Sequence, residues 1–202
     1  MDYRTEYVKA VTTNTSLDFN RRILDIVGEE SFSFEPTYLN LIRFTYIELK
    51  NFIYNPRFQY FWKDCDEMVQ KWESIKSYVD DISAIRNAMC GHLDDVAIEQ
   101  LIKERPEGFI DDISLDSQRI MISFGLLESC INHKCNLHNH LYDSNVFSMS
   151  SIPDQRAFIT FTLKLIDAVL LLSGYIITTM APIVNKENAS LIIAQLIDEN
   201  EI

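Results

Sequence analysis

Apolar residues recur at spacings of three and four along most of this 202-residue chain, and this helical period limits the possible folds more than any other feature. The clearest stripe runs from Pro36 to Tyr54, where a proline suits the first helical turn and Asn55-Pro56 ends the helix. A second stripe runs from Met68 to Met89. No segment alternates convincingly at period two, so strands are not expected. The two stripes consist of Leu39, Ile42, Tyr46, Leu49 and Ile53, and of Met68, Trp72, Ile75, Val79, Ile82, Ile85 and Met89.

The rest of the chain predicts further helices joined by short loops. Residues 94–104 form a short helix, which the segment 105–108 breaks. Ser114 or Asp116 caps a long helix whose stripe extends to Leu141, and a loop follows over residues 143–154. Two last helices cover residues 157–183 and 188–199. We therefore predict an all-α bundle of about six or seven helices, with residues 1–202 forming a single helical domain that ends in a C-terminal helical extension.

Charge limits the partners that the surface can attract. Acidic residues outnumber basic ones and give a formal net charge of −12, which disfavours non-specific binding to nucleic acid or to an anionic membrane. Any nucleic-acid site must therefore be local. Charged residues interrupt the first 30 positions, so no secretion signal is expected, and the four cysteines are expected to be reduced thiols. These features predict a cytoplasmic protein.

The segment from Ala168 to Val184 contains no charged residue. Its 17 residues fall short of the roughly 20 that a membrane span needs, and they include Ser173, Thr178 and Thr179. Lys164 precedes the segment within about a turn. We therefore predict a buried core helix rather than a membrane helix, and we expect no membrane partner.

Arg86 interrupts the second stripe. Four residues after Ile82 an apolar side chain is expected, and the chain instead has Arg86. On an ideal helix, His92 lies on the other flank of the same face, about 9 Å further along the axis and about 120° around it. Burying a permanently charged guanidinium is unfavourable unless it is paired or lines a wet cleft. The leading candidate site is therefore the segment Arg86-Asn87-Ala88-Met89-Cys90-Gly91-His92.

This segment resembles the motif of the HEPN superfamily, in which four to six residues separate an Arg from a His and a polar residue such as Asn follows the Arg. Arg86, Asn87 and His92 match that pattern, with five residues between Arg86 and His92. The resemblance covers roughly residues 72–95 and implies an all-α, metal-independent endoribonuclease without a cofactor. It also implies a homodimer whose composite active site takes an Arg and a His from each protomer. The family often acts as a toxin or in phage defence, so an antitoxin or other regulatory partner is expected.

The resemblance assigns a catalytic role to each of the three matching residues. His92 acts as general base or acid on the ribose 2′-hydroxyl or on the leaving 5′-oxygen, for which an imidazole is suited near neutral pH. Arg86 stabilises the charge that develops on the scissile phosphate. Asn87 positions backbone, phosphate or His92 by hydrogen bonds. The implied substrate is RNA, with transfer RNA as a candidate, and internal transesterification leaves a 2′,3′-cyclic phosphate.

Two alternatives to the nuclease hypothesis remain open. An ion pair from Arg86 to Asp81 or Asp94 would give the arginine a purely structural role. The chain would then be a non-catalytic helical interaction or regulatory protein, whose acidic surface meets a basic partner.

Thiols and imidazoles gather in a second cluster within eleven residues: Cys130, His133, Cys135, His138 and His140. On a continuous helix, Cys130 and His133 share one side while Cys135 and His138 face away, so one ion cannot collect four ligands. A zinc site would need local unwinding near Asn136 or Asn139. We therefore predict no metal here, but buried thiols at a polar helix end. The chain also lacks a Gly-rich phosphate loop and a nucleotide-binding fingerprint, so no cofactor is expected.

Overall fold

The computed structural model describes residues 3–29, 36–89, 95–106, 114–137 and 146–200. Every regular element in these ranges is a helix, which confirms the predicted all-α class. The eight helices of the described part are α1 (Tyr3–Glu29), α2 (Pro36–Ile53), α3 (Gln59–Trp62), α4 (Asp66–Lys76), α5 (Val79–Met89), α6 (Asp95–Glu104), α7 (Leu115–Lys134) and α9 (Ile152–Asn200).

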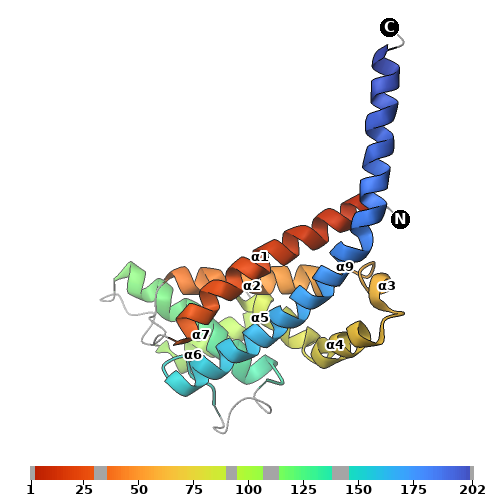
Figure 1. The fold of residues 1–202 in the computed structure, drawn as a ribbon. Coiled ribbons are helices and arrows are strands. Elements are labelled where there is room, and N and C mark those ends of the chain that lie inside the picture. The colour runs from red at the N-terminus through yellow and green to blue at the C-terminus, as the bar shows by residue number, and fades with distance from the viewer. Residues whose placement is uncertain (1–2, 30–35, 90–94, 107–113, 138–145, 201–202) are drawn as a thin grey trace.

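Helices α1 and α9 pack against each other along the bundle (Figure 1). The face that α9 turns inward is fully buried, with Leu172, Ile176 and Met180 showing no exposure to solvent. A polar contact crosses this apolar interface, because the Asn14 amide donates to Ser173 Oγ at 2.8 Å. Burial of these side chains supplies most of the driving force that holds the two helices together.

The apolar part of α9 has the composition of a membrane span and the burial of a core helix. The segment Ile152–Lys186 is long and apolar enough to cross a membrane by length and composition, and 56% of its most apolar window is buried inside the protein. Leu171 and Ile183 are partly exposed on the outer face. The inward side of this helix therefore belongs to the core, as predicted for residues 168–184.

The second apolar stripe forms two helices, whereas the sequence predicted one. Helix α4 ends at Lys76 and α5 begins at Val79. At the break, Tyr78 N donates to Ile75 O, three residues earlier, as in a turn that is tighter than an α-helix. Ile82 N then donates to Tyr78 O, four residues earlier, as in an α-helix. The Tyr78 ring meets Phe161 of α9 edge-on, with 5.0 Å between ring centroids. This tertiary contact accounts for a break that no Gly or Pro marks.

The two helices predicted at the C-terminal end form one helix, α9, so the predicted break between residues 183 and 188 is wrong. Pro182 lies inside α9 and cannot donate the usual bond to the carbonyl of Thr178. Both residues are exposed, so water can satisfy that carbonyl. Figure 1 shows that α9 changes direction as it leaves the bundle and that its last part projects beyond the other helices.

Helix α7 begins as predicted and ends earlier than predicted. Ser114 is its N-cap, with a side-chain oxygen that accepts from Ser117 N at 3.3 Å. The helix ends at Lys134 because Cys135 adopts an extended conformation, so a helix that continues to Leu141 is excluded. Asn136 N donates to Asp81 Oδ1 at 2.9 Å, and this bond ties the chain after α7 to α5.

Candidate functional site

Helix α5 places Arg86 and Asn87 at the edge of its buried face. Ile82, Ile85 and Met89 face the core, whereas Arg86 and Asn87 are only half-buried. The arginine is therefore not sealed among apolar residues, and its guanidinium reaches a position that solvent also reaches. His92 lies outside the described residues, so its predicted position on the other flank of the same helical face stays a prediction.

Two cations converge on the side-chain oxygen of Asn87. Arg86 Nη1 donates to Asn87 Oδ1 at 3.2 Å, and Lys50 Nζ, from α2, donates to the same atom at 3.2 Å. The two nitrogens therefore lie within about 6.4 Å of each other. Among the described residues, neither Lys50 nor Arg86 forms an ion pair with a carboxylate.

This arrangement favours binding of an anion. A neutral amide oxygen can accept two hydrogen bonds, but it cannot cancel two positive charges. An ammonium carries three donors and a guanidinium carries five, so both Lys50 and Arg86 keep donors beyond the bond to Asn87. A phosphate group between them would receive charge-assisted hydrogen bonds from both. Lys50 Nζ also lies 5.4 Å from the centroid of the Tyr54 ring.

The carboxylate suggested as a structural partner of Arg86 is engaged elsewhere. Asp81 is buried, and its Oδ1 accepts the backbone N–H of Asn136 at 2.9 Å. In the part of the chain that the structure describes, no ion pair joins Arg86 to Asp81. Asp94, the other suggested partner, lies outside the described residues, as does His92.

The cysteine and histidine cluster differs from the prediction because α7 ends before Cys135. Cys130 and Cys135, expected on opposite sides of a longer helix, are both buried with their sulfur atoms 4.0 Å apart. A hydrogen bond with Cys130 and burial both hold the pKa of the Cys135 thiol well above its usual value.

The remaining members of the cluster do not complete a metal site within the described ranges. His133 is exposed, and its Nε2 lies 2.7 Å from Glu104 Oε1 of α6. No group of three or more His, Cys, Asp or Glu side chains in the described residues could hold a metal ion. His138 and His140 lie outside those residues, so their part in the predicted alternative stays untested.

The sequence did not indicate Lys50 as part of the candidate site. Lys50 lies on α2, 37 positions before Asn87, and the packing of α2 against α5 brings the two side chains together. Neither periodicity nor motif spacing carries that information, because both describe neighbours along the chain. Comparison of the chain with protein-family models, with curated proteins and with solved structures found no match. The class that the fold and the site define is an all-α protein with a local cationic cluster on an acidic chain.

Proposed function

We propose that this protein is a metal-independent endoribonuclease of HEPN type. The observation that carries the proposal is the convergence of Lys50 and Arg86 on Asn87 without a carboxylate partner among the described residues. In a chain with a net charge of −12, such a cluster is a local exception that attracts a phosphate. The motif Arg86-Asn87 with His92 supplies groups suited to acid–base chemistry at that phosphate.

The proposed reaction is an internal transesterification of RNA. One His92 imidazole takes the proton of the ribose 2′-hydroxyl, whose oxygen attacks phosphorus. The bond from phosphorus to the 5′-oxygen breaks, and a protonated imidazole, that of the second copy of His92, gives a proton to this leaving group. Arg86 stabilises the charge on the non-bridging oxygens. The products are a 2′,3′-cyclic phosphate and a 5′-hydroxyl, and no metal ion takes part.

The site is proposed to form between two copies of the chain in the cytoplasm. Arg86 and His92 are about 120° apart around an ideal helix, so one protomer alone grips one phosphate poorly. Two copies across an axis supply two of each group. The proposed biological role is that of a toxin or a phage-defence protein. Transfer RNA is a candidate substrate, and an antitoxin or regulatory protein would restrain the activity.

Incubation of the purified protein with total cellular RNA and transfer RNA in excess EDTA tests the proposal. We expect the wild type to cleave and to leave 2′,3′-cyclic ends, whereas Arg86→Ala and His92→Ala do not cleave. Lys63→Ala is the matched control, because this exposed lysine directly follows α3, outside the candidate site, and its Nζ lies 5.9 Å from the centroid of the Tyr60 ring. If folded wild type cleaves nothing, that result favours a non-catalytic interaction protein.

A further inference from the structure

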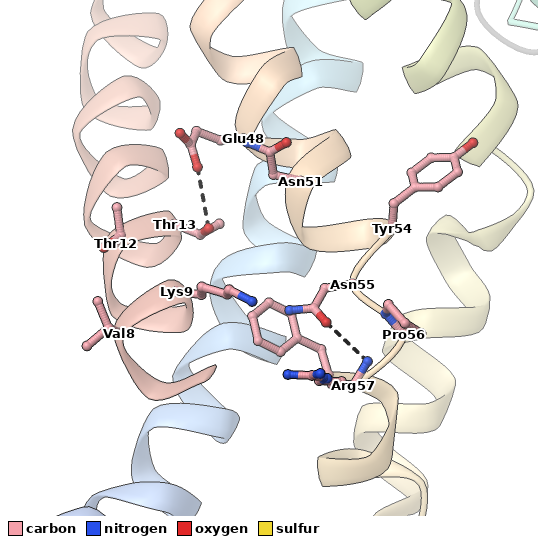
Figure 2. Close-up of a pocket in the computed structure, with 11 residues that line it drawn as sticks. Val8, Lys9, Thr12, Thr13, Glu48, Asn51, Tyr54, Asn55, Pro56 and Arg57 are labelled. Atoms are coloured by element: carbon pink, nitrogen blue, oxygen red, sulfur yellow. Dashed lines mark hydrogen bonds between the residues drawn. The ribbon is translucent and has the colours of Figure 1, made fainter. Parts of the chain in front are cut away.

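A cavity of about 610 Å³ opens between α1, α2 and the turn that follows α2 (Figure 2). Its volume falls in the range of natural ligand sites. Most of the lining surface is apolar, and hydroxyl, amide and charged groups from the two helices and the turn lie among it. The lining residues are Val8, Lys9, Thr12, Thr13, Glu48, Asn51, Tyr54, Asn55, Pro56, Arg57 and Phe58.

A buried carboxylate holds two cations at this cavity. Glu6 has no exposed surface, and its Oε1 accepts from Lys9 Nζ at 3.1 Å and from Arg57 Nη1 at 2.9 Å. Asn55 Nδ2 donates to Glu6 Oε2 at 2.7 Å. One negative charge thus faces two positive ones, so the group keeps a net positive charge.

The outer parts of these cations are available to a ligand. The side chains of Lys9 and Arg57 are 52% and 54% exposed, and their bonds to Glu6 use one donor of each charged group. Because Glu6 fixes the inner side of both groups, their remaining donors are held in place rather than free to swing. Pre-positioned donors lose less entropy when an anion binds.

Tyr54 joins this cavity to the Asn87 cluster. Its side chain lines the cavity and is 51% exposed. Figure 2 shows the ring at the rim, directed away from Lys9 and Arg57. Lys50, one helical turn before Tyr54, places its ammonium 5.4 Å from the ring centroid and bonds Asn87. Cations and an exposed aromatic ring are therefore supplied by α5, by α2 and the turn after it, and by α1.

We propose that this surface binds single-stranded RNA on one side of the scissile phosphate. The α2 track, as we call it, consists of Arg86, Asn87, Lys50, Tyr54, Arg57 and Lys9. Interleaved cations and aromatic rings are the groups that bind single strands without sequence preference, because cations hold phosphates and rings stack on bases. The assignment rests on the proposed function for the position of the cleaved bond.

Glu48 in the same cavity favours RNA over a ligand made only of phosphate. Its Oε2 accepts from Thr13 Oγ1 at 3.4 Å, and this carboxylate would repel a phosphate placed beside it. A ribose 2′-hydroxyl or a base amino group, in contrast, donates to a carboxylate. Lys9 and Arg57 at one end and Glu48 at the other suit a nucleotide with its phosphate at the cations.

We test the α2 track by measuring the binding of a labelled 12-nucleotide oligouridylate by fluorescence anisotropy. The protein carries His92→Ala, which prevents cleavage. We expect Tyr54→Ala to weaken binding about tenfold through lost stacking. We expect weaker oligouridylate binding for each of the single variants Lys50→Gln, Lys9→Gln and Arg57→Gln. Each should also lower the slope of log K against log salt by about 0.7, the value for one lost phosphate contact on a single strand. Tyr60→Ala and Lys63→Gln form the matched control, because they remove the same kind of lysine–tyrosine pair outside the track.

The outcomes separate the track from the nuclease. Binding that needs the track residues, with no cleavage by wild type, supports the track and contradicts the proposed activity. Cleavage by wild type with binding equal in the Tyr54 and Tyr60 variants overturns the track and leaves the activity standing. If wild type does not cleave RNA and binding does not need the track residues, both the track and the proposed activity are contradicted. Tyr54→Ala and Lys50→Gln leave the Glu6 contacts intact, so their effects on binding do not depend on the fold around Glu6.

Discussion

Asn87 has a neutral side chain at a position where a carboxylate would form two ion pairs. An aspartate there would accept from both Lys50 and Arg86 and cancel one of their two charges. We therefore expect Asn87→Asp to leave stability unchanged or to raise it by up to about 1 kcal/mol, because the pairs are partly exposed. RNA affinity and cleavage should fall at least tenfold. Urea unfolding and oligouridylate binding measure the two effects.

Asn87→Ala is the control for the aspartate variant, since it removes the acceptor without adding charge. Its RNA affinity should fall less than that of Asn87→Asp. Equal affinity of wild type and the aspartate variant would show that the Lys50 and Arg86 charges do not hold the substrate.

Glu6 is a buried carboxylate whose charge contributes to stability. Burial alone would raise the pKa of Glu6, but hydrogen bonds from Asn55, Lys9 and Arg57 outweigh that effect and lower the pKa below its usual value. Glu6→Gln keeps the size and loses these charge-assisted bonds, so we expect a loss of about 2 kcal/mol in the free energy of unfolding at pH 7.

The pH dependence of this difference follows from the sign of the shift. A carboxyl whose pKa is lower in the folded state contributes stability above its unfolded pKa of about 4.3, and that contribution is lost as pH falls through the folded value. The gap between the free energies of unfolding of wild type and Glu6→Gln should therefore narrow as the pH falls below about 5 and through the lowered folded pKa. Urea unfolding over this range measures it, and a gap that stays constant would contradict the role assigned to Glu6.

Among the helices, the contact between α6 and α7 depends on the absence of a side chain. A Cβ built on Gly125 of α7 overlaps Leu101 Cδ1 of α6, and Leu101 is buried. At Gly174 of α9, a Cβ meets nothing within 4 Å. We expect Gly125→Ala to destabilise the protein by about 1–3 kcal/mol through overpacking. Gly174→Ala, its matched control, should stabilise by about 0.5–1 kcal/mol because alanine favours the helix.

Thermal unfolding of both glycine variants measures the contrast. Leu101→Ala should cost less stability in the Gly125→Ala background than in the wild type, since it removes the atom that the new methyl group meets. If Gly125→Ala is as stable as Gly174→Ala, α6 has room to move and the close packing is not required.

Elements that depend on local signals were predicted from the sequence, and those that depend on tertiary contacts were not. Pro36 and the stripe that follows it placed α2, and the Ser114 cap placed the start of α7. The break before α5 follows from the packing of Tyr78 on Phe161, and the end of α7 is tied to Asp81 by Asn136. Such contacts join residues far apart in the chain and leave no periodic trace.

The same reasoning applies to the candidate site. The spacing within one helix indicated Arg86 and Asn87. Lys50 and the Glu6 group became visible only through packing of α2 against α5 and α1, since each contact joins distant segments. The C-terminal end gives a different lesson, because the break predicted between residues 183 and 188 is absent and α9 continues through Pro182, whose neighbours are exposed.

At the scale of the whole molecule, the charge sets opposite requirements for assembly and for substrate. Each protomer has a net charge of −12, so two protomers repel each other through solvent, and two copies of the Lys50–Arg86 pair facing an axis repel each other as well. RNA, in contrast, is attracted by that pair and released as salt competes for its phosphates. Salt therefore strengthens the proposed dimer and weakens the proposed complex with RNA.

We expect the dimer dissociation constant to fall severalfold between 50 and 300 mM salt, a range over which the screening length shrinks from above to below roughly 10 Å. Affinity for oligouridylate should fall over the same range. At protein concentrations near the dissociation constant, cleavage should then pass through a maximum at intermediate salt. Analytical ultracentrifugation, anisotropy and an RNA cleavage assay at matched salt concentrations measure the three trends. A protein that cleaves fully as a monomer at every salt concentration would rule out a composite site at a dimer interface.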